Sequence, residues 1–185
     1  MKAFIIVGEQ GRGKTTEAYN IIDNFKQKDL FAYDVHGHYF EKFQNRSKIK
    51  GRPKMEVFLE IVSNVKNSVI VFEEATIFFS NRGREETIIE LLVNNYHSKN
   101  VILFLFHSLR SVPVEIMDFV QFIKLYHTND RVTLINNKFK EDSGLIEVFN
   151  DVSEKTSDTD KNRDTNEYSD SKSELFYHYS RIYSR

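Results

Sequence analysis

The chain has 185 residues, of which 40% are hydrophobic, so it can bury one substantial core but not two ordinary enzyme domains. It contains no cysteine, which excludes disulfide bonds, thiol catalysis and cysteine-ligated metal. The net charge of −1 excludes nucleic-acid binding by bulk attraction, so any such contact must be local. No apolar run approaches the roughly 20 residues of a membrane helix. We expect a soluble protein without a membrane span.

Apolar runs and helical spacing alternate along the first part of the chain. Five runs have the length of buried strands: residues 3–7, 30–33, 69–72, 101–106 and 122–126. Three segments between them space their apolar residues as helices do: residues 18–25, 55–65 and 88–96. Strands that alternate with helices predict a parallel sheet with both faces covered. The fold class is therefore α/β, with three layers and a mainly parallel central sheet.

The pattern changes after the fifth run. Weakly alternating stretches at 132–135 and 145–148, separated by turn residues, predict a small C-terminal hairpin. Residues 151–173 are mostly polar with little to bury, so we predict a flexible linker there. Residues 174–185 are aromatic and basic again, so they could stack on single-stranded bases or dock on another protein surface. The predicted organisation is one domain over 1–150, the linker, and this C-terminal segment.

A glycine-rich loop directly follows the first predicted strand. Residues 8–15 read GEQGRGKT, which fits the spacing Gly, four residues, Gly, Lys, Ser or Thr. In such a loop, backbone N–H groups and the positive end of the next helix bind phosphate, the lysine reaches the β and γ oxygens, and the threonine ligates Mg²⁺. We assign nucleotide binding to Gly8, Glu9, Gln10, Gly11, Arg12, Gly13, Lys14, Thr15 and Thr16, and a metal contact to Thr15.

Two glutamates directly follow the strand predicted at 69–72. Alone, Glu73 and Glu74 could be a solvated pair, but a phosphate loop upstream favours a catalytic role. In proteins with such a loop, the first carboxylate holds the Mg²⁺ shell and an adjacent glutamate polarises the attacking water. We assign Glu73 to the metal and Glu74 to the water. The pair predicts hydrolysis of a nucleoside triphosphate, with ATP and Mg²⁺ as the default ligands.

Later polar residues are further catalytic candidates. The run at 101–106 continues into His107 and Ser108. If this strand lies between the strand of the phosphate loop and that of the acidic pair, one of these side chains would face the γ-phosphate and sense its loss. Three arginines are candidates for stabilising the transferred phosphoryl group, in the same chain or from a neighbour in a ring: Arg82, Arg84 and Arg110. Each of them also fits a solvated surface role.

Several segments together resemble the HerA/FtsK-type ATPases. They are the phosphate loop, residues 34–39, the strand ending in the acidic pair, residues 82–84 and residues 106–113. The small size is similar to the viral genome-packaging ATPases, whereas the segment order also resembles the zonula occludens toxin-like ATPases of filamentous phages. No membrane segment follows the core as in the phage proteins, which favours packaging.

The resemblance implies a P-loop NTPase fold of the RecA-like type and a ring that pulls DNA through its pore, with ATP between subunits. By position, His107 falls near the family's polar sensor. The implied partners are DNA bound without sequence specificity, further copies of this chain, and a capsid or portal-like protein at the C-terminal segment. The implied location is the host cytoplasm or the virion. A basic run at 42–54 could touch DNA phosphates or be a solvated loop.

Two other classes of function stay open. A P-loop nucleoside or nucleotide kinase would use Arg82 and Arg84 as a phosphate lid, transfer phosphate to a small acceptor and ignore DNA. A nucleotide-dependent switch would turn over slowly and order its tail in the ATP state. The sequence has no evident nucleoside-binding signature beside the acidic pair, which favours the motor over the kinase.

Overall fold

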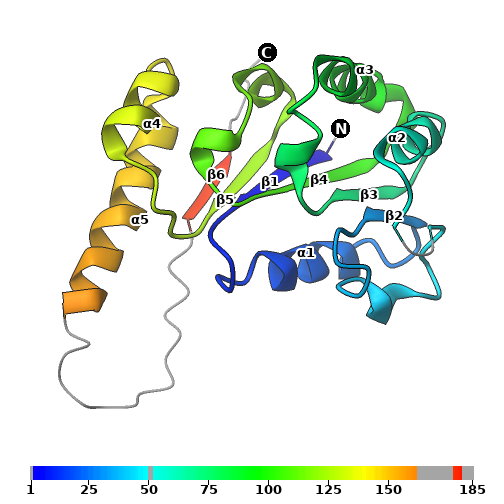
Figure 1. Cartoon of the computed structure of the whole chain (residues 1–185), viewed down its shortest axis with the longest axis horizontal. Helices are drawn as coiled ribbons and strands as arrows, with labels where there is room; N and C mark the ends of the chain where they lie inside the picture. The colour runs from blue at the N-terminus through cyan, green and yellow to red at the C-terminus, as the bar shows by residue number, and fades with distance from the viewer. Residues whose placement is uncertain (1, 50–51, 162–176, 181–185) are drawn as a thin grey trace.

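A computed structural model describes residues 2–49, 52–161 and 177–180. The chain forms a six-stranded sheet with the order β2-β3-β4-β1-β5-β6 (Figure 1). The strands are β1 (Lys2–Val7), β2 (Leu30–Tyr33), β3 (Val69–Phe72), β4 (Val101–Phe106), β5 (Phe122–Leu125) and β6 (Tyr177–Ser180). The first five are parallel, and β6 pairs antiparallel with β5 at one edge. The five predicted strands and the mainly parallel α/β sheet are confirmed.

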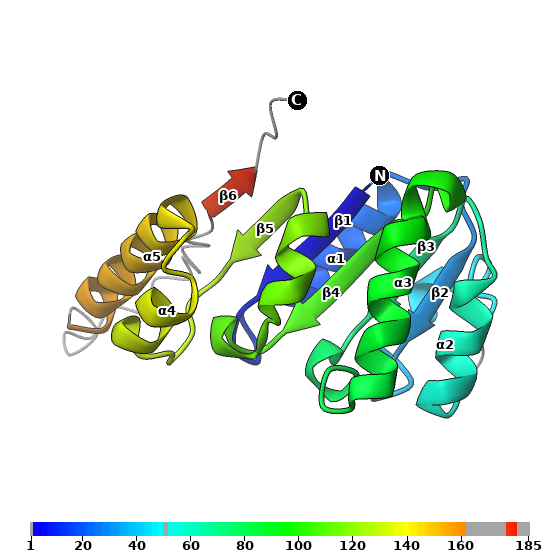
Figure 2. The same cartoon turned by 90° about the horizontal axis from the view of Figure 1, so that it is seen from above.

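Helices cover both faces of the sheet and complete three layers (Figures 1 and 2). Helix α1 (Lys14–Asp23) lies on one face, where Ala18 and Ile22 join a buried cluster with strand residues. Helices α2 (Met55–Ser63) and α3 (Arg82–Ser98) lie on the other face and share a second cluster. Four short helical turns complete this part: η1 (Glu41–Phe43), η2 (Ala75–Ile77), η3 (Leu109–Ser111) and η4 (Val114–Phe119). All residues of β4 are buried, as expected for a strand covered on both faces.

The helix predictions hold, but one residue of α3 lies on the opposite face from the one expected. Tyr96, which the apolar spacing placed in the core, is 73% exposed. Asn95 is buried instead, where its side chain accepts a hydrogen bond from Asn100 N at 2.9 Å and donates to Asn100 O at 3.2 Å. A polar residue fits this core position because the turn into β4 satisfies its hydrogen bonds.

The predicted hairpin is wrong, because both of its stretches are helical. The helices are α4 (Val132–Lys138) and α5 (Ser143–Lys161). In α5 the buried residues Leu145, Phe149 and Val152 recur at helical spacing. In α4 the alternation would have buried Leu134, which is 42% exposed. Short alternating stretches fit both the period of a strand and that of a helix. Packing against the sheet edge decides between the two.

Helix α5 continues to Lys161, so the first residues of the segment predicted as a linker are helical. The remainder of that segment, 162–173, lies outside the described residues. Of the C-terminal segment, the structure describes only β6. The proposed domain boundaries therefore stay a prediction. Within the described part of the chain, no helix is long and apolar enough to span a bilayer.

The register of the central strands brings three candidate segments to one edge of the sheet. Val7 of β1 lies beside Phe106 of β4, and Phe104 lies beside Phe72 of β3. The phosphate loop, the acidic pair and His107 each leave the carboxyl end of one of these strands. Ligands of open parallel sheets bind at this edge.

Candidate functional site

The phosphate loop runs from the end of β1 into α1, and its glycines are required for two different reasons. Gly11 and Gly13 have φ angles of 77° and 90°, a region that residues with a side chain rarely adopt. Gly13 is the N-cap of α1, so this conformation turns the chain into the helix. Gly8 is limited by space, because a Cβ there would lie 2.7 Å from the Cβ of Tyr126. The loop thus packs its backbone directly against the residue that follows β5.

Lys14 is 9% exposed and points back over the loop. Its Nζ donates to Gly8 O at 2.6 Å and to Glu9 O at 2.9 Å. Burial lowers the pKa of Lys14, while attraction to Glu74 and Glu73 opposes this shift. A partly desolvated cation is attracted more strongly by an incoming phosphate oxygen than one in open water. The position suits the phosphate-binding role that the loop pattern predicts.

His107 joins Lys14 to Glu74. Its Nδ1 lies 3.2 Å from Lys14 Nζ, and its Nε2 lies 2.7 Å from Glu74 Oε2. A protonated lysine can only donate, so Nδ1 is the acceptor of this contact and Nε2–H donates to the carboxylate. The condition set for a sensor also holds, because β4 lies between β1 and β3. The sensing role itself stays a prediction.

Glu73 is half-buried, like Glu74, and contacts the connection after β2. Its Oε2 accepts a hydrogen bond from Val35 N at 3.0 Å. Burial raises the pKa of Glu73, this hydrogen bond opposes the shift, and the nearby Asp34 adds to it. No preformed group of three metal-binding side chains occurs among the described residues. Mg²⁺ needs none, since it keeps waters and substrate phosphates and takes one or two protein oxygens. A Thr15 hydroxyl and a Glu73 carboxylate therefore fit it.

Asp34 supports this region; from the sequence it stood only within the segment 34–39 that carries the family resemblance, without a role of its own. Its carboxylate is buried and accepts from three backbone N–H groups: His36 at 3.0 Å, Gly37 at 2.8 Å and Phe40 at 3.2 Å. These bonds close the loop that holds Val35 beside Glu73. In such a turn, an aspartate accepts hydrogen bonds from backbone N–H groups a few residues later. In the sequence, this turn is visible only as an aspartate that follows a strand.

We expect Asp34→Ala to lower the free energy of unfolding by about 3 kcal/mol, because one buried and two partly buried backbone N–H groups lose their acceptor. Urea unfolding followed by circular dichroism measures this loss. Asp34→Asn retains one carbonyl oxygen that can still accept from His36 and Gly37, so its loss should be smaller. Equal stability of the alanine variant and the original chain would contradict the supporting role.

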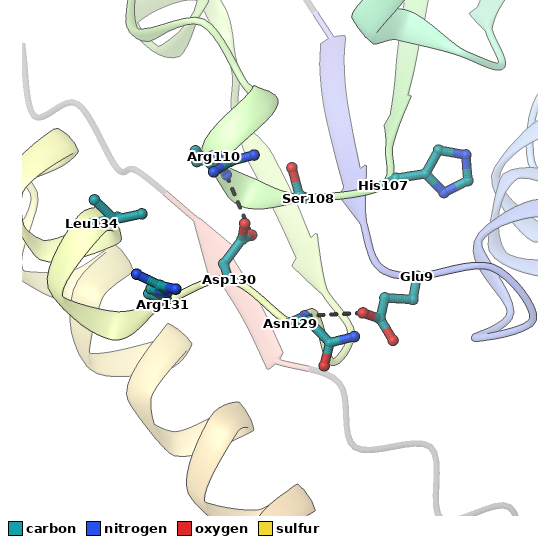
Figure 3. A pocket seen from close by; sticks show the side chains of 8 residues that line it. All are labelled: Glu9, His107, Ser108, Arg110, Asn129, Asp130, Arg131 and Leu134. Atoms are coloured by element: carbon teal, nitrogen blue, oxygen red, sulfur yellow. Dashed lines mark hydrogen bonds between the residues drawn. The ribbon is translucent and has the colours of Figure 1, made fainter.

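A cavity of about 480 Å³ opens beside the phosphate loop (Figure 3). Its lining residues come from the loop, the end of β4, η3, the β5–α4 connection and α4: Glu9, His107, Ser108, Arg110, Asn129, Asp130, Arg131 and Leu134. Asp130 Oδ2 accepts from Leu109 N at 2.7 Å, and Asn129 N donates to Glu9 Oε1 at 3.0 Å. These bonds tie the β5–α4 connection to both other walls. The cavity offers room for the remainder of a nucleotide next to its phosphates.

The three candidate arginines have different surroundings. Arg110 lines the cavity. The side chain of Arg84 is 20% exposed, pairs with Glu56 at 3.5 Å and donates to Ile77 O at 2.9 Å, so it joins α2 to η2 within the chain. The side chain of Arg82 is 91% exposed at the start of α3. It pairs with Glu86 at 3.1 Å on the same helix. Arg82 and Arg110 are both exposed, and all three catalytic roles stay predictions.

Three residues of the basic run at 42–54 make contacts within the chain, including Lys42, which pairs with Asp23 at 3.8 Å. The guanidinium of Arg46 donates to the carbonyls of Ile22, Phe25 and Lys28, at distances between 2.7 and 3.3 Å. Lys48 pairs with Asp29 at 3.2 Å. Arg46 therefore closes the end of α1 and is an unsuitable DNA contact. For the exposed basic residues of the run, both interpretations stay predictions.

The sequence matches no protein-family model and no curated protein. Solved structures are similar, however. The DNA-packaging ATPase B204 from Sulfolobus turreted icosahedral virus has 15% identity and a TM-score of 0.67, with 98% of each chain covered. The genome packaging NTPase B204 from Sulfolobus turreted icosahedral virus 2 was solved with AMP, at 14% identity, a TM-score of 0.62, and 82% of this chain and 86% of that chain covered. Its complex with AMPPCP has 12% identity and a TM-score of 0.60, covering 77% of this chain and 84% of that chain.

These identities establish similarity of the fold. The strand order, the three layers and the phosphate loop between β1 and α1 are the features of this chain that position its candidate site. The resemblance noted from the sequence is therefore confirmed at the level of architecture. The chain has the α/β P-loop NTPase fold of the B204 viral genome-packaging ATPases.

Proposed function

We propose that this chain is an ATP-hydrolysing motor that moves DNA, acting as a viral genome-packaging ATPase. The observation that carries the proposal is the series of contacts from Lys14 through His107 to Glu74. It joins a phosphate-binding cation, a polar sensor and a carboxylate across three adjacent strands, at the edge where the phosphate loop lies. Proteins with the same fold include a DNA-packaging ATPase and a packaging NTPase bound to ATPγS, which supports this assignment.

The residues would divide the chemistry among them. The loop N–H groups and Lys14 hold the β- and γ-phosphates, and Glu74 orients a water and accepts its proton as the water oxygen attacks the γ-phosphorus. The bond from the γ-phosphorus to the bridging oxygen breaks, which leaves ADP and inorganic phosphate. Mg²⁺, held by Thr15 and Glu73, would neutralise phosphate charge. A phosphate oxygen would replace the Gly8 and Glu9 carbonyls as the partner of Lys14 Nζ. Because His107 contacts both Lys14 and Glu74, it would transmit this change to Glu74.

The motor would act as a ring of identical subunits. The exposed Arg82 supports a contribution to a neighbour's site, where an arginine stabilises the transition-state charge. Contacts to DNA would be independent of sequence. A capsid or portal-like partner at the C-terminal segment, and a location in the host cytoplasm or virion, belong to the same proposal.

Phosphate release from ATP, measured without DNA and with single- or double-stranded DNA, tests the proposal. The original chain is expected to release phosphate several-fold faster with DNA. Lys14→Ala should lose both nucleotide binding and hydrolysis, because the phosphates lose their buried cation. Lys26→Ala, which removes an exposed lysine beyond α1, is the matched control and should retain both.

The same assay separates the other functions. Slow turnover that ignores DNA, with nucleotide bound tightly, would favour the switch. Transfer of the γ-phosphate to a small acceptor would favour the kinase. Either outcome would contradict the motor.

A further inference from the structure

The β5–α4 connection, residues 126–131, forms one wall of the cavity and also contacts the phosphate loop. Glu9 N donates to His127 O at 3.2 Å, and Asn129 N donates to Glu9 Oε1 at 3.0 Å. These bonds use the backbone of the connection, whereas the side chain of Asn129 lines the cavity (Figure 3). A ligand in the cavity therefore meets the same segment that holds the phosphate loop.

Asp130 connects this segment to the turn that opens η3. Its Oδ2 accepts from Leu109 N at 2.7 Å, from Arg110 N at 3.3 Å and from Thr128 Oγ1 at 3.0 Å. Leu109 and Thr128 are both buried. Hydrogen bonds to a carboxylate are roughly twice as strong as those between neutral groups. Asp130 therefore fixes where η3 begins relative to the β5–α4 connection.

The start of η3 determines where His107 lies, because His107 is two residues before Leu109. His107 contacts Lys14 Nζ at 3.2 Å and Glu74 Oε2 at 2.7 Å. Phe106, just before it, is fixed as the buried and paired end of β4. A shift of Leu109 must then be absorbed in the two residues between these fixed points, of which His107 is one.

We propose that Asp130 is a positioning residue that couples a nucleoside in the cavity to the placement of His107, so that hydrolysis at Glu74 is fast only for nucleoside triphosphates. The inference rests on the proposed function in that the loop binds phosphates and Glu74 serves the attacking water. It adds a substrate class. The chain should discriminate a nucleoside triphosphate from inorganic tripolyphosphate, which has three phosphates but no group to fill the cavity.

The cavity has groups that suit a nucleoside. Arg110 and Arg131 supply N–H donors, the amide of Asn129 supplies donors and an acceptor, and Leu134 supplies apolar surface. All four are exposed, so a ligand can reach them. Contacts to Asn129 and Arg131 would restrain the two chain neighbours of Asp130. Tripolyphosphate makes no such contacts, so it leaves the connection unrestrained.

Steady-state phosphate release from ATP and from tripolyphosphate, each with Mg²⁺ and without DNA, tests the proposal in the full chain. In both substrates water attacks the terminal phosphorus and its bond to the bridging oxygen breaks, which leaves phosphate with ADP or with pyrophosphate. We expect kcat for ATP to exceed kcat for tripolyphosphate by about tenfold or more, because small displacements of catalytic groups are costly. Asp130→Ala should bring the two kcat values to within about threefold by lowering that for ATP, with little change in KM for ATP.

Asp142→Ala is the matched control. Asp142 Oδ1 also accepts from a backbone N–H, that of Leu145 at 3.1 Å, but at the start of α5 and outside the residues that line the cavity. This variant should lose stability and keep the original ratio of the two kcat values, which separates positioning from a general loss of stability. Asp130→Asn retains an oxygen that can accept from Leu109 N, so its ratio should be intermediate. It carries the test if Asp130→Ala does not fold.

AMP tests the coupling without hydrolysis, because it brings a nucleoside but no β- or γ-phosphate. We expect AMP to shift the imidazole NMR signals of His107 in the original chain and not in Asp130→Ala. Tripolyphosphate, which acts on His107 through Lys14, should shift them in both. The spectrum of His107→Gln assigns the signals.

Three results would overturn the inference: equal kcat values for the two substrates in the original chain, an unchanged ratio in Asp130→Ala, or an AMP-induced shift of His107 that persists in that variant. The motor is judged separately. DNA-stimulated ATP hydrolysis with an unchanged ratio in Asp130→Ala would reject the coupling and leave the motor. Loss of the ratio in a chain whose hydrolysis ignores DNA would support the coupling and reject the motor. If the original chain hydrolyses neither substrate, the proposed function fails and the AMP experiment decides the coupling.

Discussion

Replacing Glu74 with glutamine should slow ATP hydrolysis by about 10² to 10⁴ fold while ATP continues to bind. The amide has the shape of the carboxylate, and its carbonyl oxygen can still accept the hydrogen bond from His107 Nε2. It cannot take a proton from water, however, so the loss should fall on the chemical step. Single-turnover phosphate release measures that step, and a fluorescent ATP analogue measures binding.

Glu73→Gln is the matched control, because it removes the neighbouring carboxylate from a different role. The hydrogen bond from Val35 N engages Glu73 Oε2, whereas Glu74 contacts His107, so the loss of the Glu73 carboxylate should weaken Mg²⁺-dependent binding instead. A Glu74→Gln variant that hydrolyses ATP at the original rate would show that the base lies elsewhere. A variant that loses binding as well would contradict the division of roles between the two carboxylates.

Gly8→Ala should lower the free energy of unfolding by about 3 kcal/mol and weaken nucleotide binding with it. The added methyl would lie 2.7 Å from Tyr126 Cβ, which is the rigid base of a buried side chain and cannot rotate away. Relief requires a shift of the loop or of the chain after β5, and overpacking of this kind costs about 1 to 3 kcal/mol. Thermal unfolding with and without ATP measures both effects.

Gly83→Ala provides the comparison within the same chain. It lies in the first turn of α3, where the nearest atom to a new Cβ is Asn81 Oδ1 at 3.4 Å. Alanine favours a helix over glycine by up to about 1 kcal/mol, so stability should not fall. Equal midpoints for Gly8→Ala and the original chain would show that the loop tolerates a side chain at its first position.

The elements that could be predicted from the sequence are those whose pattern is complete within a few residues. β2, β3 and β4 have the predicted bounds, because each is apolar on every residue and bordered by polar ones. The phosphate loop was recognisable for a similar reason, since its function needs particular residues at fixed spacing. The stretch at 145–148 failed because four alternating residues fit a strand, whereas its helix became evident only over the longer span to Val152.

Support of the site by Asp34 and Asp130 could not be read from single positions. Both carboxylates bind backbone N–H groups of loops, and an aspartate after a strand has the same appearance whether it is buried or solvated. Burial of Asp34 depends on the neighbours that the folded sheet supplies. The same limit applies to Arg46 and Arg84. In the sequence they are two basic residues among others, and only the folded chain makes them donors to internal carbonyl groups.

The sequence by itself determined the phosphate loop, the five parallel strands and the presence of two carboxylates after the third, because these follow from local apolar patterning and local turn chemistry. Only the tertiary structure decided that Lys14 meets His107, which is 93 residues away, and that His107 meets Glu74, which is 33 residues away. Those contacts depend on β4 lying between β1 and β3. Strand order is set by how helices of both layers pack over the whole sheet, and no local stretch of sequence contains that information.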